Sequence, residues 1–161
     1  VAAAHRHPPH GRGTVGMVQV FPNSRNVIPG RVKFSIDLRN STDALVDQMA
    51  DEVKAFAATV AQEHGVDVKI EMVSSYSAIG FHPDCVDAVG RAAAKLGYSN
   101  MPVVSGAGHD AVYMAKLTSS GMIFIPCKDG ISHNEIEDAK PEHITAGCNV
   151  LLHAMLERAG S

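Results

Sequence analysis

The chain has 161 residues, a net charge of −3 and 45% hydrophobic residues. This length suits one large core or two small ones, and the composition is that of a globular protein rather than a disordered one. The 14 basic and 17 acidic residues are spread along the chain, which excludes the basic stripe of a nucleic-acid-binding surface. No apolar run approaches the ~20 residues that cross a bilayer, so we expect no membrane partner.

The three cysteines, Cys85, Cys127 and Cys148, form no CxxC pair. An odd number of cysteines at unrelated spacings is typical of reduced, buried thiols. The sequence therefore predicts a cytoplasmic protein.

The N-terminal stretch predicts a helix end, a linker and two strands. Residues 1–4 are typical of the end of a helix, and the histidines, prolines and glycines of 5–13 predict a flexible linker. Three valines, Val15, Val18 and Val20, favour a strand over Thr14–Phe21. Residues 22–30 are rich in turn-forming types, and Arg31–Arg39 alternates strictly between apolar and polar residues, as in a half-buried strand.

A helix and a third strand follow. Ser41 or Thr42 is expected to cap a helix that runs to His64, with Gly65 at its left-handed end. Alternation over 66–72 predicts the third strand. Together with the first two strands this gives β-β-α-β, which we interpret as part of a ferredoxin-like domain over residues 12–80.

The remainder, residues 81–161, predicts an α/β layer, so the fold class is α/β (α+β) in two domains. Strands are expected to alternate with helices and loops, in this order: a helix from Pro83 to Leu96, a strand over 101–105, a glycine turn, a helix over 110–117, an apolar strand over 121–126, a loop over 127–140 and a helix from Pro141 to about Ala159.

The loop after the apolar strand contains a candidate metal ligand. His133 stands in the run Gly-Ile-Ser-His-Asn-Glu-Ile-Glu, residues 130–137. Loops at the carboxyl ends of α/β strands often carry the functional site, and a neighbouring carboxylate can orient an imidazole that binds zinc. The alternative is a solvated loop histidine.

The run Ser-Gly-Ala-Gly-His-Asp-Ala, residues 105–111, is a second candidate. Its glycines allow backbone N–H groups to approach an anion or a developing oxyanion at a helix start. The same residues fit a dinucleotide fingerprint, with Asp129 as the acidic partner, or a glycine turn needed only for packing.

Asn26 and Arg39 form a third candidate, since a guanidinium and an amide together suit a carboxylate. The competing interpretation is a local surface pair between Arg39 and Asp37.

These motifs together resemble the amidase branch of the M20 metallopeptidase family, which includes N-carbamoyl-L-amino-acid hydrolases, β-ureidopropionases and allantoate amidohydrolases. The first matching stretch is Thr-Val-Gly at 14–16 with Asn-Val-Ile-Pro-Gly-x-Val-x-Phe-Ser-x-Asp-x-Arg at 26–39. The others are 105–111 and Pro-Cys-x-x-Gly-Ile-Ser-His-Asn at 126–134. The order and spacing of the three stretches make the resemblance specific.

The resemblance implies a dimerisation (lid) domain followed by the C-terminal part of a zinc-hydrolase catalytic domain. His133 would be the last metal ligand of a two-metal site that holds Zn²⁺, with Mn²⁺, Co²⁺ or Ni²⁺ as alternatives. Asn26 and Arg39 would hold the substrate carboxylate across a homodimer interface, and Gly108 and His109 would line the pocket near the scissile amide. Zinc would activate a water for attack on the carbamoyl or ureido carbon.

The resemblance also implies that the remaining metal ligands and the general base precede this chain, so no catalytic residue is assigned within it. One histidine does not build a catalytic zinc site, which needs about three protein ligands. We therefore expect the chain alone to be inactive. An M20 exopeptidase and a non-catalytic dimerisation module are the alternatives.

Overall fold

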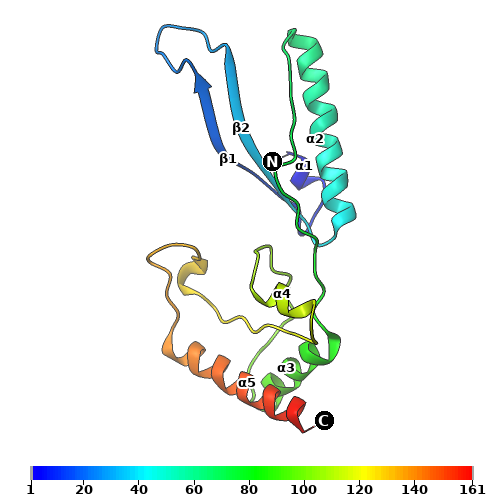
Figure 1. The fold of residues 1–161 in the computed structure, drawn as a ribbon. Coiled ribbons are helices and arrows are strands. Elements are labelled where there is room, and N and C mark those ends of the chain that lie inside the picture. The colour runs from blue at the N-terminus through cyan, green and yellow to red at the C-terminus, as the bar shows by residue number, and fades with distance from the viewer. Residues whose placement is uncertain (1, 161) are drawn as a thin grey trace. The chain divides into compact units, whose positions relative to one another are not determined.

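The computed structural model describes residues 2–160 (Figure 1). The chain divides into two compact units, one ending at Ala78 and the other beginning at Ile79. The elements in chain order are α1 (Ala2–His5), β1 (Arg12–Phe21), β2 (Arg31–Arg39), α2 (Asp43–His64), α3 (Pro83–Lys95), α4 (Ala111–Ala115), the 3₁₀ turn η1 (Lys128–Gly130) and α5 (Pro141–Ala159). The parts of our predictions that fall on residues 1 and 161 lie outside the described residues.

The first unit is built on an antiparallel hairpin of β1 and β2. Arg12 lies opposite Arg39, Phe21 lies opposite Arg31, and the register shifts between Thr14 and Met17. The N–H of Gly30 closes the connecting turn on the carbonyl of Phe21 at 3.0 Å. Both predicted strands are confirmed, with β1 beginning two residues earlier than expected because its first residues pair with the end of β2.

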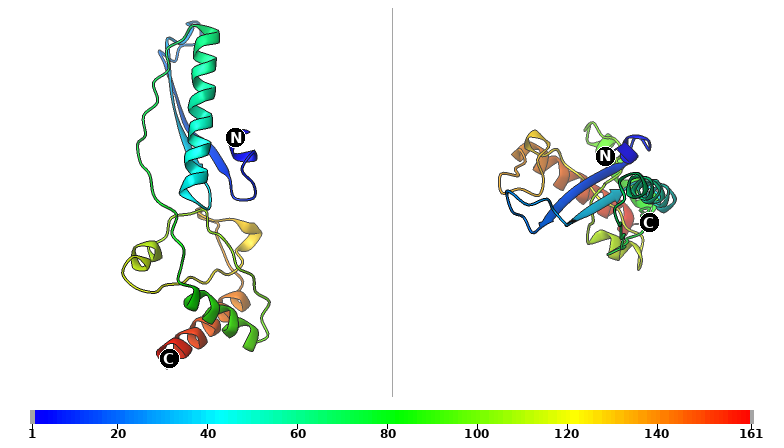
Figure 2. Two further views of the ribbon diagram at one scale, coloured as in Figure 1. Left: turned by 90° about the vertical axis from the view of Figure 1, so that its right-hand side faces the viewer. Right: turned by 90° about the horizontal axis from the view of Figure 1, so that it is seen from above.

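Helix α2 lies along this hairpin (Figure 2) and begins and ends as its sequence predicts. The hydroxyl of Thr42 accepts the N–H of Leu45 at 3.3 Å, and Gly65 adopts φ +62° while its N–H bonds to the carbonyl of Ala61. A left-handed residue at this position is the usual helix end that glycine permits. Met49 is fully buried on this helix and forms the centre of the small core of the unit.

The stretch after α1, predicted as a flexible linker, is instead attached to α2. The Arg6 guanidinium donates to the Glu52 carboxylate at 2.9 Å, and the His7 ring lies 2.8 Å from the same carboxylate. Gly11 is required where the chain turns back into β1, since a Cβ there would lie 2.5 Å from the carbonyl oxygens of Ala4 and His7. Ion pairing and close backbone contact therefore order a segment whose composition alone suggested mobility.

The contribution of Glu52 to stability is expected to depend on pH. Hydrogen bonds from His7 and Arg6 lower the pKa of Glu52 below its ordinary value. Its stabilising contribution is therefore complete above the pKa of the unfolded chain and is lost as the pH falls through the lower pKa of the folded state. Between pH 7 and pH 3, urea unfolding of Glu52→Gln should vary less with pH than that of the native chain. Glu63→Gln on the same helix is the control, and equal pH dependence in all three proteins would contradict the prediction.

Three further strands predicted from the sequence are absent from the described residues. Segments 66–72, 101–105 and 121–126 form no ladder, and the sheet contains only β1 and β2. Their apolar side chains remain largely exposed: Val68 is 50% exposed, Val103 56% and Phe124 50%. A strand is defined by hydrogen bonds to a neighbouring strand, and within residues 2–160 no strand pairs with these segments. The α/β layer expected over 81–161 is consequently not formed.

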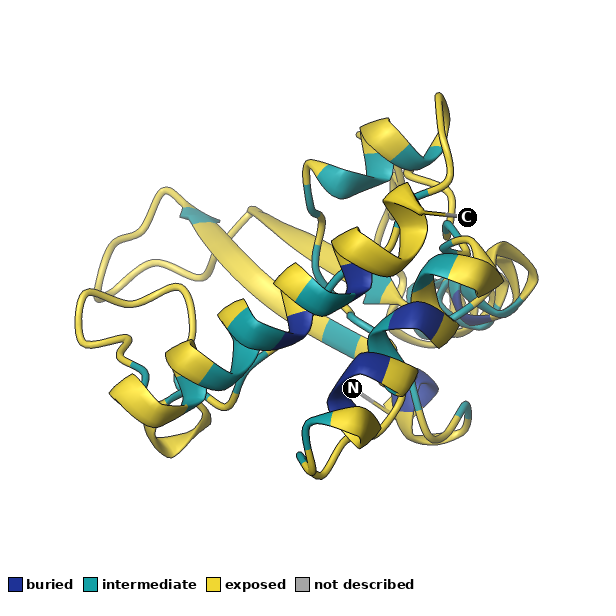
Figure 3. Cartoon of the chain, turned by 90° about the horizontal axis from the view of Figure 1, so that it is seen from below, coloured by how far each residue is buried: buried dark blue, intermediate teal, exposed yellow. Residues whose placement is uncertain are grey.

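The second unit is held together by the packing of α3 on α5. Its small core consists of four alanines and one valine: Ala88, Ala92, Ala93, Val150 and Ala154. Partly buried apolar side chains pack around this core: Val89, Leu96, Tyr98 and Ile123. Figure 3 shows that buried positions are few and concentrated on helices. The Arg91 guanidinium bridges the two helices to Glu157 at 2.6 Å. The predicted helix boundaries are confirmed for α3 and α5, whereas α4 is shorter than the predicted 110–117.

The described chain is thus a mixed α/β protein with a two-stranded sheet. The first unit contains β-β-α of the predicted β-β-α-β order.

Candidate functional site

His109 is held by the residue that begins its own loop. The Oγ of Ser105 lies 2.6 Å from Nε2 of His109 and accepts the N–H of Ala107 at 3.2 Å. The ring of Phe124 meets the imidazole edge to face, with centroids 5.5 Å apart. The half-buried imidazole therefore has a defined orientation, while Gly108 beside it is exposed and leaves space where a side chain would stand.

His133 lies in an ordered loop that follows η1. Its backbone has φ +57°, and its N–H donates to the Glu137 carboxylate at 2.9 Å. The Oγ of Ser132 lies 3.3 Å from Nδ1 of the ring. Positive φ is uncommon outside glycine, although histidine tolerates it better than most residues. A carboxylate thus lies beside His133 as predicted, but it contacts the backbone N–H and not the ring.

Arg39 at the end of β2 pairs with Asp37 two residues before it. The guanidinium donates from Nε and from Nη2 to the carboxylate, the latter at 2.7 Å, and both side chains are about half exposed. Hydrogen bonds from Arg39 lower the pKa of Asp37, and Asp37 raises the pKa of Arg39. The local surface pair is therefore present, and it orients a guanidinium that stays charged at any physiological pH.

Asn26 lies in the exposed turn between β1 and β2, where the hydroxyl of Ser24 donates to its Oδ1 at 2.8 Å. Because this oxygen accepts the bond from Ser24, the amide has a preferred orientation in the turn. Asn26 and Arg39 both belong to the hairpin unit, whereas Gly108, His109 and His133 belong to the other unit.

The candidate residues of the second unit lie in two separate loops, one before α4 and one after η1. In Figures 1 and 2, α4, which follows His109, and η1, which precedes His133, both lie away from α3 and α5. Within residues 2–160, no three histidine, cysteine or acidic side chains lie close enough together to hold one metal ion. The described residues therefore do not form a complete zinc site by themselves.

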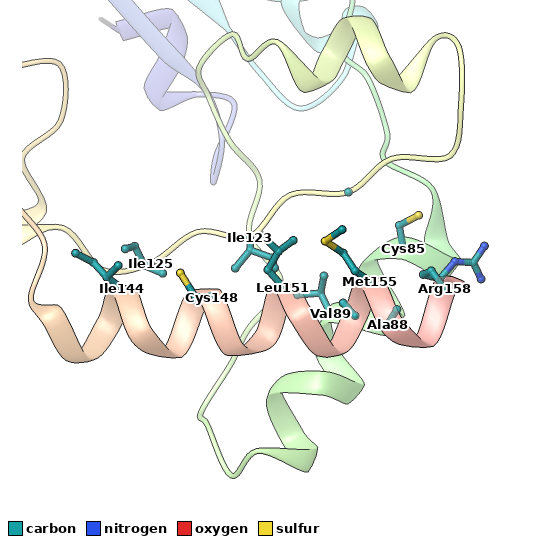
Figure 4. Close-up of a pocket in the computed structure, with 13 residues that line it drawn as sticks. Cys85, Ala88, Val89, Ile123, Ile125, Ile144, Cys148, Leu151, Met155 and Arg158 are labelled. Carbon is teal, nitrogen blue, oxygen red and sulfur yellow. The ribbon is translucent and has the colours of Figure 1, made fainter. Parts of the chain in front are cut away.

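An apolar groove of about 460 Å³ lies on the helical side of this unit (Figure 4). Ile144, Leu151 and Met155 of α5 line this groove and are 48–61% exposed, whereas Val150 and Ala154 of the same helix are buried. Cys85, from α3, and Cys148, from α5, also line it; Cys148 is exposed, and neither is fully buried. The groove offers almost no polar groups and is not a place for hydrolysis.

Two contacts of the candidate residues were not predicted from the sequence. Ser105 was included in a motif without a role, although a hydroxyl four residues before a histidine in a glycine-rich turn is within reach of its ring. Glu137 was expected to orient the His133 imidazole, and it supports the backbone of that residue instead.

Comparison with known proteins gives a consistent result. Residues 4–157 match the family described as peptidase family M20/M25/M40. An N-carbamoyl-L-amino-acid amidohydrolase from Rhizobium meliloti is 45% identical over 156 residues, which cover 97% of this chain and 38% of that protein. A ureidoglycolate hydrolase from Oryza sativa subsp. japonica is 32% identical over 149 residues, which cover 89% of this chain and 30% of that protein. Among the described residues, no helix has the length and apolarity that a bilayer span requires.

The structural comparison agrees with this. The crystal structure of an amidase of the hydantoinase/carbamoylase family from Burkholderia multivorans superposes with a TM-score of 0.95 at 51% identity, covering 99% of this chain and 39% of that one. The chain spans less than two fifths of the length of these relatives. These relatives are named as an amidohydrolase, a hydrolase and an amidase, and the chain belongs to peptidase family M20/M25/M40.

Proposed function

We propose that this chain is part of an amidohydrolase that cleaves the linear C–N amide or ureido bond of N-carbamoyl amino acids or related ureido acids. The observation that carries the proposal is its 45% identity, over nearly its whole length, to an N-carbamoyl-L-amino-acid amidohydrolase. The three motifs that resemble the amidase branch fall on the ordered features described above: the 22–30 turn with the end of β2, the Ser105–His109 loop, and the loop around His133.

The residues have different tasks in this proposal. Arg39, oriented by Asp37, and Asn26 bind the carboxylate of the substrate, because a guanidinium fork and an amide match two carboxylate oxygens. His109 and Gly108 line the pocket at the scissile bond. His133 contributes one ligand to a metal site, for which we favour Zn²⁺ over Mn²⁺, Co²⁺ or Ni²⁺.

The remaining metal ligands and the general base belong, in this proposal, to polypeptide outside these 161 residues. The reason is that residues 2–160 assemble no group of three ligands, whereas a catalytic zinc needs about three from the protein. The chain by itself is therefore expected to be inactive.

We further propose a cytoplasmic homodimer formed through the hairpin unit as a ferredoxin-like lid domain (residues 12–80). The apolar side chains of the sheet support this, since Val18, Phe34 and Ile36 are each 44–60% exposed and need a cover. Residues 81–161 would then belong to the catalytic domain.

The test uses a protein of the relatives' length that contains this chain, here called the relative-length protein. It should hydrolyse N-carbamoyl amino acids or allantoate with a higher kcat/KM than dipeptides. Faster cleavage of dipeptides would assign the chain to the exopeptidases and reject the proposal.

Replacement of His133 by alanine in the relative-length protein should lower its bound metal, because loss of one ligand from a site of three to four weakens coordination. Metal content is measured by elemental analysis after dialysis. His64→Ala, an exposed histidine at the end of α2, is the control and should retain full metal. Full occupancy in His133→Ala would remove this residue from the ligand set.

A non-catalytic dimerisation module is the second candidate, and the absence of a three-ligand group within residues 2–160 favours it for the isolated chain. Whether the chain is part of an amidohydrolase or a dimerisation module, calorimetric titration of the 161-residue chain with Zn²⁺ should show no stoichiometric binding at micromolar concentration. Tight one-to-one binding would instead reveal a metal site complete within this chain.

A further inference from the structure

Ser105 and His109 share a hydrogen bond through the ring nitrogen Nε2. The Oγ of Ser105 lies 2.6 Å from Nε2 of His109. The same Oγ already accepts the backbone N–H of Ala107 at 3.2 Å. A serine hydroxyl has one O–H to donate, and within residues 2–160 the only acceptor in contact with it is this imidazole nitrogen.

The direction of the bond follows from this arrangement. If Nε2 were protonated, it would donate to Oγ, and the half-buried hydroxyl would receive two N–H groups while its own proton had no acceptor. If Nε2 is unprotonated, the hydroxyl donates to it while accepting the N–H of Ala107, so the hydroxyl is satisfied both as a donor and as an acceptor.

We propose that Ser105 is a positioning residue that holds neutral His109 in the tautomer with its proton on Nδ1. Within the described residues, no hydrogen bond to Nδ1 is present, so the Nδ1–H remains available to an acceptor outside the loop. The edge-to-face contact with Phe124 restrains the ring against rotation. The bond made by one ring nitrogen decides the state of the other.

The role of this tautomer in substrate binding rests on the proposed function. In a pocket for ureido acids, an Nδ1–H at a fixed place is a donor for the carbonyl or carboxylate oxygen of the substrate, and its position beside Gly108 lets a ligand approach closely. A histidine protonated on Nε2 would present an acceptor there and would repel the same oxygen.

The described residues do not complete the arrangement of a serine nucleophile. A serine nucleophile needs a histidine base that is oriented by a third group at its other nitrogen, and His109 has no such partner among residues 2–160. The carboxylate of the adjacent Asp110 makes no hydrogen bond to the ring within the described structure.

The experiment is long-range ¹H–¹⁵N correlation NMR of the ¹⁵N-labelled 161-residue chain at about two pH units above the usual histidine pKa, where the ring is neutral. His109→Gln identifies the signals of His109. In the native chain, Nε2 should show the shift of an unprotonated ring nitrogen and Nδ1 that of a protonated one. In Ser105→Ala the pattern should shift toward Nε2–H, the form that neutral histidine prefers in water, and Ser105→Thr, which retains the hydroxyl, should keep the native pattern.

Three results would overturn the proposal: Nε2–H in the native chain, an unchanged pattern in Ser105→Ala, or the alanine pattern in Ser105→Thr. The native spectrum alone decides the tautomer, even if a variant does not fold, and backbone amide spectra report folding of each variant. The readout involves no catalysis. An Nδ1–H tautomer in a relative-length protein that does not cleave ureido acids would therefore reject the proposed function and leave the role of Ser105 intact.

Discussion

Arg39→Ala in the relative-length protein should raise the KM for an N-carbamoyl amino acid by about 30-fold or more. Truncating one partner of a charge pair that becomes desolvated costs roughly 2–5 kcal/mol, and each 1.4 kcal/mol is about tenfold in affinity. The Arg39 fork is oriented by Asp37 but is half exposed in this chain, so the full effect requires that bound substrate exclude water from it. Steady-state kinetics with a carboxylated substrate and with its amide derivative measure the effect.

Two variants make this prediction specific. Arg39→Lys keeps the charge but not the two-pronged geometry, so it should recover only part of the affinity. Lys33→Ala removes another cation from the same face of β2 and should change KM little. An unaltered KM in Arg39→Ala, or an equal loss for the amide derivative, would rule out carboxylate recognition by this residue.

Met49→Ala should destabilise the hairpin unit by about 2–5 kcal/mol, the usual cost of removing a large buried side chain and leaving a cavity. Met49 is 0% exposed and is the one large side chain of the described residues that is fully buried. The amide of Asn40 also contacts its sulfur at 3.6 Å. Amide hydrogen exchange, read peptide by peptide, should show faster exchange throughout α2.

Met72→Ala is the matched control for this substitution. Met72 belongs to the same unit and is 74% exposed, so its loss should change the exchange of α2 by less than ~0.5 kcal/mol. Similar effects of the two substitutions would show that Met49 is not the centre of the core.

The helices were predictable because the signals that define them are local. Thr42 caps α2 through its own hydroxyl, and Gly65 supplies the left-handed end. Pro83 and Pro141 begin α3 and α5, at a position where a backbone N–H would have no acceptor within the helix. Each of these effects acts within about one helical turn, so the sequence around it is sufficient.

The strands were predictable only in part, because their partners are not local. β1 and β2 find each other across a short turn. Segments 66–72 and 121–126 have equally strong strand patterns, yet no neighbour pairs with them among residues 2–160. Apolar alternation reports that a segment suits a sheet, and not that a second strand is present beside it.

The candidate site also combines contacts that are local in sequence with one that depends on how a loop folds. The motif residues are ordered by contacts close in sequence: Ser24 with Asn26, Asp37 with Arg39, and Ser105 with His109. Of these three contacts, sequence reasoning anticipated only the pair between Asp37 and Arg39. It did not indicate that Glu137 would bind the backbone of His133, because that depends on how the loop after η1 folds.

The left-handed backbone at His133 restricts which substitutions can report on the side chain. Alanine at φ +57° carries a steric cost of roughly 1–2 kcal/mol that glycine does not, so His133→Ala changes the shape of the loop as well as removing the imidazole. His133→Gly tolerates the same dihedral angle, and asparagine tolerates it nearly as well. Agreement between the glycine and alanine variants would therefore separate the chemistry of the ring from the conformation that presents it.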